Sequence, residues 1–224
     1  LYFTKPLFSL RELFKACTNG ASELMTNISM SLVSALYNIQ LLKLFGADGV
    51  AAYGVLMYVG FVFAAVFIGY SQGTAPIVSY HFGADNKDEL KNLLRKSAGI
   101  IAVAGVAMLA SSELLAGPLA KIFVGYDAGL LALTIHGMKL YSISFILSGF
   151  NIFGSAFFTA LNNGAVSAAI SFLRTLVFQS ASVLILPVFF GVDGIWWAIT
   201  VAEVFAFLIS GMFLLLKRNK YHYM

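Results

Sequence analysis

The stretch Val50–Tyr80 reads VAAYGVLMYVGFVFAAVFIGYSQGTAPIVSY and contains no Lys, Arg, Asp or Glu. A helix needs about 20 mostly apolar residues to cross a bilayer. Polar and apolar residues do not alternate here, as they would in a strand of a membrane barrel. Because the bilayer core offers no water to backbone polar groups, a helix is the conformation that satisfies them. We therefore expect a spanning helix over Val50–Tyr70 that continues as helix to Tyr80.

Five further apolar runs exceed or approach the same length. They cover Ala21–Leu42, Ala98–Leu119, Met138–Leu161, Ala165–Phe190 and Ile195–Leu216. Short stretches with turn-forming residues separate several of them, for example Gly46–Gly49, Asn162–Gly164 and Gly191–Gly194. The sequence thus predicts an all-α integral membrane protein with six transmembrane helices in one domain, residues 1–224.

Three polar segments with apolar residues on one side are predicted to form short helices at the membrane surface. They are Ser9–Lys15, Lys87–Lys96 and Asp127–His136. The chain begins at Leu1 without Met, and its opening residues do not form a signal peptide. We therefore expect it to be the C-terminal part of a longer protein.

The composition supports lipid as the main solvent. Hydrophobic residues make up 60% of the chain and charged residues 11%, whereas a soluble domain carries about 25% charged residues. The mean hydropathy is +0.88. These values exclude a disordered chain, a nucleic-acid-binding domain and an ordinary cytosolic enzyme. The single Cys17 allows no disulfide within the chain.

The basic residues predict the orientation in the membrane. Six spans place both termini on one side, and that side collects ten basic residues: Lys5, Arg11, Lys15, Lys87, Lys91, Arg95, Lys96, Lys217, Arg218 and Lys220. The other side receives Lys43, Lys121 and Lys139. Loops rich in Lys and Arg stay on the cytoplasmic side, so we expect both termini in the cytoplasm.

Polar residues inside the spans form stripes along helix faces. At 100° per residue, each of the first two sets below falls within about 80° of arc. The first span carries Glu23, Asn27, Ser31, Ser34 and Asn38, and the fourth carries Ser144, Ser148, Asn151, Ser155 and Thr159, with Tyr141 on the same face. The fifth span carries Ser167, Ser171, Arg174 and Ser182, and the sixth carries Trp196, Thr200, Glu203 and Ser210.

These stripes allow two interpretations. Serines alone are typical of packing between membrane helices, whereas stripes that also contain Glu and Asn favour a water-filled cavity. Arg174 lies about ten residues into its span, where a charge costs at least about 2.5 kcal/mol. It therefore needs a carboxylate or several carbonyls as partners, and Glu203 is one possible ion-pair partner. Glu23 lies near the cytoplasmic end of its span and could instead lie at the headgroup level.

The chain shows no Walker loop, HExxH or GxSxG motif. His81, His136 and His222 have no partner at metal-ligand spacing. A membrane-embedded enzyme would need converging acid, base or metal groups, and no His, Cys or Asp lies in mid-span. We therefore expect no enzyme activity, no metal and no cofactor.

Several motifs resemble those of the multidrug and toxic compound extrusion (MATE) transporters. Gln72–Asn86, QGTAPIVSYHFGADN, is similar to the signature that closes a long helix in this family. Ala160–Gly164 with Ser171–Arg174 resembles the stretch before and within its eleventh helix, and Gly191–Trp197 with Ala202–Glu203 resembles the entry to its twelfth. Asn19–Glu23 with Leu36–Asn38 resembles the seventh helix of the MepA-like bacterial branch.

The resemblance covers nearly the whole chain and implies helices seven to twelve of a twelve-helix transporter, with the N-terminal lobe absent. It implies a bacterial cytoplasmic-membrane antiporter that exports cationic or amphipathic compounds in exchange for H⁺ or Na⁺. Its partners would be the lipid bilayer, the missing lobe and small substrates, without nucleic acid. The candidate pathway residues are Glu23, Asn27, Ser31, Ser34, Asn38, Tyr141, Ser148, Asn151, Ser155, Arg174 and Glu203.

One departure from the family concerns the coupling ion. Some branches have an acidic residue in mid-helix seven, where this chain aligns Met30, and another in helix ten, where the fourth span has no Asp or Glu. The missing lobe is therefore an alternative place for coupling. Two other functions remain open: a flippase of lipid-linked saccharides from the same broad superfamily, and a homodimeric six-helix scaffold or channel.

Overall fold

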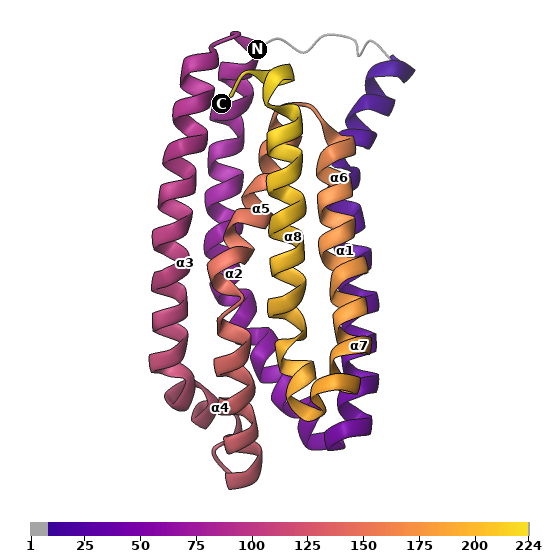
Figure 1. Cartoon of the computed structure of the whole chain (residues 1–224), viewed down its shortest axis with the longest axis vertical. Helices are drawn as coiled ribbons and strands as arrows, with labels where there is room; N and C mark the ends of the chain where they lie inside the picture. Colours follow the sequence, from indigo (N-terminus) through magenta and orange to yellow (C-terminus); the bar gives the residue numbers. More distant parts are fainter. Residues whose placement is uncertain (1–8, 224) are drawn as a thin grey trace, which may run out of the picture.

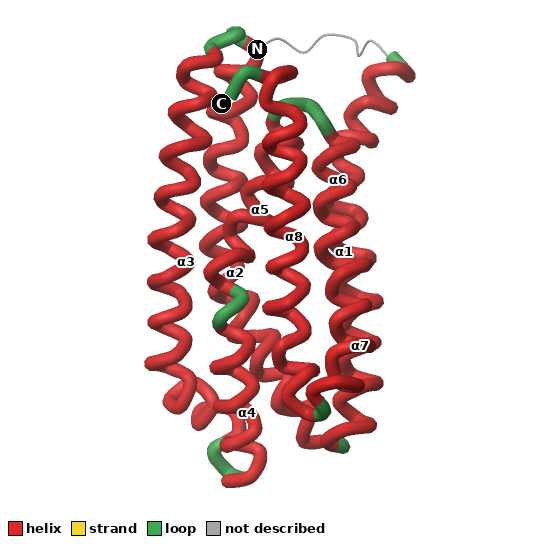
Figure 2. Tube along the Cα trace, in the orientation of Figure 1, coloured by secondary structure: helices red, strands yellow, loops and turns green. Residues whose placement is uncertain are grey.

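The computed structural model describes residues 9–223, and in the first helix it leaves out the side chains of Glu12, Thr18, Asn19, Ala21, Ser22, Glu23 and Met25. Within this part of the chain every regular element is a helix (Figures 1 and 2). The helices are α1 (Leu10–Phe45), α2 (Ala47–Gly83), α3 (Lys87–Val124), α4 (Ala128–Ser142), α5 (Phe145–Ala160), α6 (Gly164–Phe172), the π-helical η1 (Leu173–Gln179), α7 (Ser180–Phe190) and α8 (Val192–Tyr221). The beginning of α1 and the end of α8 lie at the same end of the bundle (Figure 1).

Five of these helical stretches are long and apolar enough to cross a bilayer, and α4 with α5 makes a sixth if the bent pair counts as one span. The continuous helix predicted through Pro76 is confirmed, since α2 runs unbroken over Ala47–Gly83. Tight turns separate the spans as the sequence indicates. Gly46 and Gly191 take positive φ angles of 66° and 59°, and Asn86 and Asn163 accept hydrogen bonds from the first turns of α3 and α6.

The fourth predicted span, Met138–Leu161, is a bent pair of helices and not a single helix. The chain bends by 51° between α4 and α5. At the bend the Ser144 N–H donates to the carbonyl of Tyr141, three residues back, at 3.0 Å. The Ser142 hydroxyl binds the carbonyl of Lys139 at 2.8 Å and the carboxylate of Glu113 at 2.9 Å. Serine side chains that bind nearby backbone groups compete with the helical ladder, which accounts for the break.

The three predicted surface helices are also corrected. Asp127–His136 is not a separate surface helix, because Asp127 caps α4 and the following residues belong to the first half of the bent span. Lys87–Lys96 and Ser9–Lys15 run directly into α3 and α1. Helix α3 continues without a break through Ser97, so the polar segment Lys87–Lys96 and the apolar span that follows form one helix.

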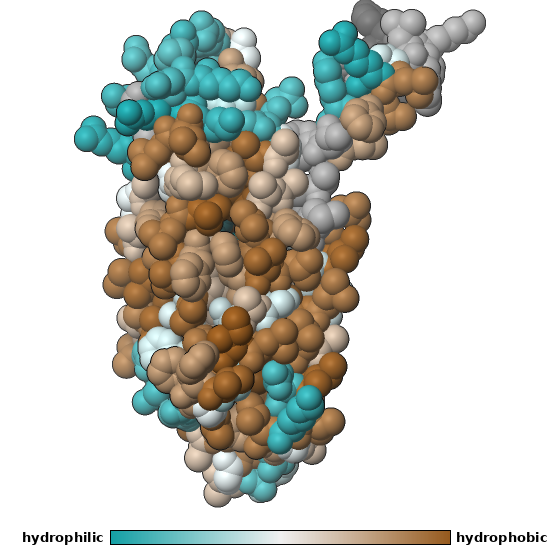
Figure 3. Space-filling model, turned by 45° about the vertical axis from the view of Figure 1, so that its right-hand side comes forward, coloured by the Kyte–Doolittle hydropathy of each residue, from teal (hydrophilic) through white to brown (hydrophobic). Residues whose placement is uncertain are grey.

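Two hydrophobic clusters fill the two ends of the bundle. One cluster includes Leu41, Leu56 and Trp196, and the other includes Phe67 and Phe157. On the face drawn in Figure 3 the middle of the bundle is mostly apolar, and hydrophilic residues gather towards its ends. An apolar band between two polar ends is the surface expected of a protein that spans a bilayer.

The C-terminal tail closes the second cluster. His222 takes a positive φ of 54° and ends α8. The chain then turns back, so that the Tyr223 ring is fully buried, lies 5.3 Å from the Phe157 ring, and its hydroxyl donates to the carbonyl of Leu214 at 3.0 Å. Burial raises the pKa of the Tyr223 phenol.

Helix α5 offers a matched pair of glycines that tests the packing. A Cβ on Gly149 would lie 2.7 Å from the Phe67 ring and 2.8 Å from Ile101, whereas a Cβ on Gly154 would lie 3.6 Å from Ser210. Overpacking a tight core costs about 1–3 kcal/mol. We expect Gly149→Ala to lower the unfolding temperature of the detergent-solubilised protein and Gly154→Ala to leave it nearly unchanged. Equal unfolding temperatures for the two variants would contradict this packing.

Candidate functional site

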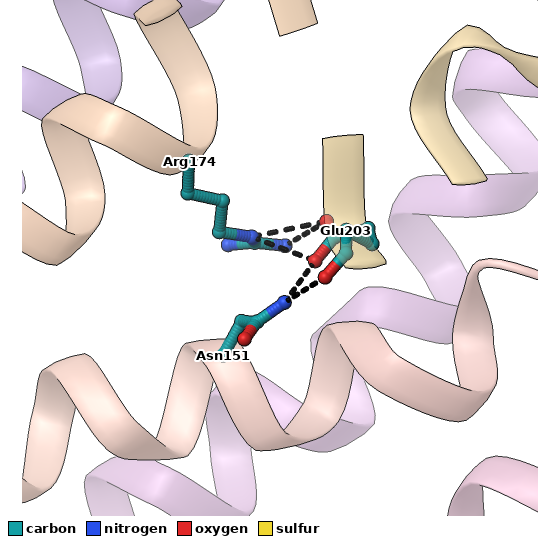
Figure 4. Close-up of polar contacts among 3 residues, drawn as sticks. All are labelled: Asn151, Arg174 and Glu203. Atoms are coloured by element: carbon teal, nitrogen blue, oxygen red, sulfur yellow. Dashed lines mark hydrogen bonds and ion pairs between the residues drawn. The ribbon is translucent and has the colours of Figure 1, made fainter. Parts of the chain in front are cut away.

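Arg174, Glu203 and Asn151 meet in the interior from three separate helical elements, η1, α8 and α5 (Figure 4). The Arg174 Nε donates to both carboxylate oxygens of Glu203 at 3.0 Å, and its Nη2 donates to Oε1 at 2.6 Å. The Asn151 amide donates to Glu203 Oε2 at 2.6 Å and to the Glu203 carbonyl at 3.0 Å. The ion pair that the sequence offered as a possibility is therefore present, and Asn151 extends it to a triad.

The triad is deeply buried. The side chains of Glu203 and Arg174 are 2% and 18% exposed, and Asn151 is completely buried. Charges removed from water are tolerated when they are paired and hydrogen-bonded. The triad meets that condition for both charges, but it leaves the Asn151 Oδ1 without a hydrogen-bond partner among the described residues.

The backbone that carries Arg174 is irregular. Leu173–Gln179 forms a π-helical segment between the α-helical stretches α6 and α7. In a π-helix each bond spans five residues instead of four, and such segments are rare and occur frequently at functional sites. The sequence did not indicate this segment, since the composition of LRTLVFQ gives no local signal for a π-helix.

Ser155 and Thr159 of α5 contact α6. The Ser155 hydroxyl lies 2.9 Å from the hydroxyls of both Ser167 and Ser171, and Thr159 lies 2.6 Å from Ser167. These contacts agree with the interpretation that the serines pack helices together. They do not agree with the water-filled cavity that the sequence favoured for the stripe of the fourth span. The sequence placed Ser155 and Ser167 on separate stripes, and the turn at Asn162–Gly164 brings the two stripes face to face.

Tyr141 and Ser148 flank the bend between α4 and α5. Tyr141 is half-buried, and its hydroxyl fills the space left by Gly60, where a Cβ would lie 2.5 Å from it. Ser148 is buried, and its hydroxyl has no hydrogen-bond partner within residues 9–223. Because of the 51° bend, Tyr141 does not continue the α5 stripe in a straight line as predicted.

The stripe on α1 has a different environment from that on α5. Asn27, Ser31 and Asn38 are exposed and Ser34 is half-buried. The opposite side of the helix, with Ser29, Val33 and Tyr37, is buried. The side chain of Glu23 lies outside the described part of the chain, so its contribution to the stripe stays a prediction from the sequence. The two predicted stripes are thus not brought together within this bundle.

Among the described residues no group of three or more His, Cys, Asp or Glu side chains lies close enough to hold a metal ion. One further polar contact that the sequence did not indicate joins α4 to the first turn of α8. The His136 Nε2 lies 2.8 Å from Asp193 Oδ1, with both side chains about half exposed. Because the two residues lie 57 positions apart in the chain, no pattern in the sequence indicated this contact.

The fold and the buried charges define a multi-pass helical membrane protein with polar groups inside its bundle. A family model described as MatE matches residues 24–183. The match covers more than half of the chain, and the chain belongs to this family.

The multidrug export protein MepA of Staphylococcus saprophyticus is 23% identical over 215 residues, which are 94% of this chain and 45% of that protein. A crystal structure of MATE in complex with MaL6 matches 97% of this chain and 49% of its own length, with a TM-score of 0.89 and 19% identity. An outward-facing multidrug resistance MATE family transporter of the MOP superfamily matches 99% of this chain and 50% of its own length, with a TM-score of 0.89 and 21% identity. The chain therefore spans about half the length of these relatives and shares their fold.

Proposed function

We propose that the chain is the C-terminal lobe, helices seven to twelve, of a multidrug efflux antiporter in the bacterial cytoplasmic membrane. The transporter would export cationic or amphipathic compounds in exchange for H⁺ or Na⁺, by alternating access between this lobe and an N-terminal lobe. The motifs at Gln72–Asn86 and Gly191–Trp197 support this assignment, as does the similarity to MepA, a multidrug export protein.

The polar stripe of α1 is the observation that carries the proposal. At 100° per residue the exposed arc of this helix includes two neighbouring parts. Asn27, Ser31, Ser34 and Asn38 occupy one part, and the apolar side chains Leu24, Ile28, Leu32, Ile39 and Leu42, each about half exposed, occupy the adjoining part. An apolar arc suits lipid, whereas polar groups at membrane depth face a bundle interior or a water-filled cavity. The polar part therefore fits one wall of a pathway completed by a second lobe.

Glu23 and Asn27 are the proposed entrance of this pathway. They lie four residues apart and hence one above the other on the helix. A carboxylate at this place could exchange a proton as the pathway changes access, or attract an organic cation from the cytoplasm. Both roles require the acidic group and would be lost in Glu23→Gln.

The buried charges favour a cation transporter over the alternatives. A flippase for lipid-linked saccharides would be served by a basic cavity, and the charge of Arg174, the basic residue deep within a span, is neutralised by Glu203. A homodimeric scaffold or channel would be complete with six helices, whereas the relatives of this chain are about twice as long. Relatives described as transporters likewise favour transport over membrane-embedded catalysis.

Efflux of a cationic dye from cells that express the full-length protein tests the proposal. Asn38→Leu removes one hydrogen-bonding group, which contributes about 0.6–1.4 kcal/mol, so the rate of efflux should fall about threefold to tenfold. Glu23→Gln should abolish efflux. Ile39→Leu, one position from Asn38 on the apolar arc, is the matched control and should transport like wild type. Wild-type efflux by both Asn38→Leu and Glu23→Gln at matched expression would contradict the proposed pathway.

The proposed orientation has its own test. Asn86, Asp127 and Asn219 are exposed at the ends of helices, and Asp127 lies at the opposite end of the bundle from the other two. In a background without Cys17, cysteines at Asn86 and Asn219 should resist an impermeant thiol reagent in intact cells, and a cysteine at Asp127 should react. Labelling of the cysteine at Asn86 from outside would contradict a cytoplasmic location of the termini.

A further inference from the structure

The members of the Arg174–Glu203–Asn151 triad differ in exposure. The Glu203 side chain is 2% exposed and Asn151 is completely buried, whereas the Arg174 side chain is 18% exposed. Asn151 and Glu203 are therefore the inner pair, in which the Asn151 amide donates to the Glu203 carboxylate at 2.6 Å and to the Glu203 backbone carbonyl at 3.0 Å. Arg174 is the most exposed member of the triad.

The inner pair has the chemistry of a cation site. A carboxylate held by an amide donor keeps acceptor capacity for the N–H groups of a cation, and Arg174 uses it through three contacts of 2.6–3.0 Å. The Asn151 Oδ1, on the same amide that holds Glu203, is a buried acceptor with no partner among the described residues. A buried acceptor without a partner is uncommon in folded proteins. The pair therefore offers one more acceptor than Arg174 uses.

A change in the backbone of η1 could release Arg174 from Glu203. Arg174 is the second residue of the π-helical segment Leu173–Gln179, and the stretches before and after this segment are α-helical. Conversion of the segment to α-helix would shift its hydrogen-bond register by one residue and turn the Arg174 side chain about the helix axis. Glu203 and Asn151 lie on regular α-helices, α8 and α5, and would keep their places.

We propose that Arg174 is a tethered cation that occupies a cation site formed by Glu203 and Asn151, and that a cationic substrate takes its place when the π-helical segment releases it. The inference rests on the proposed export of cations and assigns a residue-level site and a release step to it. Because the planar guanidinium fits the carboxylate through two nitrogens, guanidinium-like cations are the class that matches the site best.

The binding test uses methylguanidinium as the probe, with tetramethylammonium at equal concentration as the control cation. In the full-length protein, Arg174→Ala leaves the site vacant, and the probe should raise its unfolding temperature by several degrees. The probe should have no such effect on wild type, on the Arg174→Ala/Glu203→Gln double variant, or on Arg218→Ala, a variant of an exposed arginine at the end of α8. If Arg174→Ala is recovered folded only when the probe is present, that rescue also supports the site.

Three results would overturn the inference. The probe could leave the unfolding temperature of Arg174→Ala unchanged, it could raise that of the double variant equally, or Arg174→Ala could fail to fold even with the probe. Arg174→Gln/Glu203→Gln, which leaves no unpaired charge, provides a second arm. We expect it to fold and to lose cationic dye efflux by at least about tenfold, and wild-type efflux would show a purely structural pair and overturn the inference. Absence of efflux in wild type itself would refute the proposed function, while the probe measurement would still decide on the cation site.

Discussion

Arg174→Leu is expected to reduce the folded yield of the protein severely. The substitution leaves the Glu203 carboxylate buried, with Asn151 as its remaining side-chain donor. Removing one partner of a buried ion pair destabilises a protein by about 3–5 kcal/mol, because the other charge stays buried without compensation. The measurement is the fraction of monodisperse protein after solubilisation from membranes at equal expression.

The matched control is the double variant Arg174→Leu/Glu203→Leu. Replacing both members of a buried pair by apolar residues is often neutral or stabilising, so the double variant should recover most of the folded yield. A second control, Arg218→Leu, removes an exposed arginine of α8 and should leave the yield unchanged. A normal yield of Arg174→Leu would mean that Glu203 does not depend on this ion pair.

Gly194→Ala is expected to have the other large effect, on the turn between α7 and α8. A Cβ at this position would overlap the carbonyl group of Leu186 and lie 2.7 Å from the backbone nitrogen of Pro187. Backbone atoms cannot move aside as a flexible side chain can, so the hairpin of α7 and α8 would have to shift. Because α8 also carries Glu203, we expect a loss of several kcal/mol, at or above the upper end of the ~1–3 kcal/mol typical of overpacking.

Gly211 provides the control within the same helix. No atom would lie within 4 Å of a Cβ there, so Gly211→Ala should be neutral or should stabilise α8 by up to about 1 kcal/mol through helix propensity. Unfolding temperatures of both variants in detergent give the comparison. Similar temperatures for Gly194→Ala and Gly211→Ala would contradict the close approach of α8 to the Leu186 carbonyl.

The helices could be predicted from the sequence because each is set by local properties. A run such as Val50–Tyr80 has no other way to satisfy its backbone in lipid, and Gly46, Asn163 and Gly191 mark turns by their own conformational preferences. The bend at Ser142–Ser144 involves a hydrogen bond to Glu113 of α3, and the π-helical segment packs against α8 and α1. Such tertiary contacts leave no periodic signal in the sequence.

The candidate site was predictable in part for the same reason. The cost of a lone charge in lipid made a partner for Arg174 necessary, and Glu203 was a possible carboxylate at a compatible depth. The contribution of Asn151 was not predictable, because the composition of its stripe on α5 favoured a water-filled cavity over a contact with Glu203. The helical wheel placed Ser155 on the same face as Asn151, and only the fold shows that Ser155 binds α6 while Asn151 binds α8.

Transport by the purified full-length protein in proteoliposomes tests the central claim most directly. The vesicles would carry an imposed H⁺ or Na⁺ gradient, and movement of a cationic dye against its own gradient would be followed by fluorescence. We predict dye movement that is driven by one of the two ion gradients and abolished when that gradient is collapsed. Dye movement that is absent, or that is indifferent to both gradients, in vesicles with correctly folded protein would contradict the assignment of this chain to a cation-exporting antiporter.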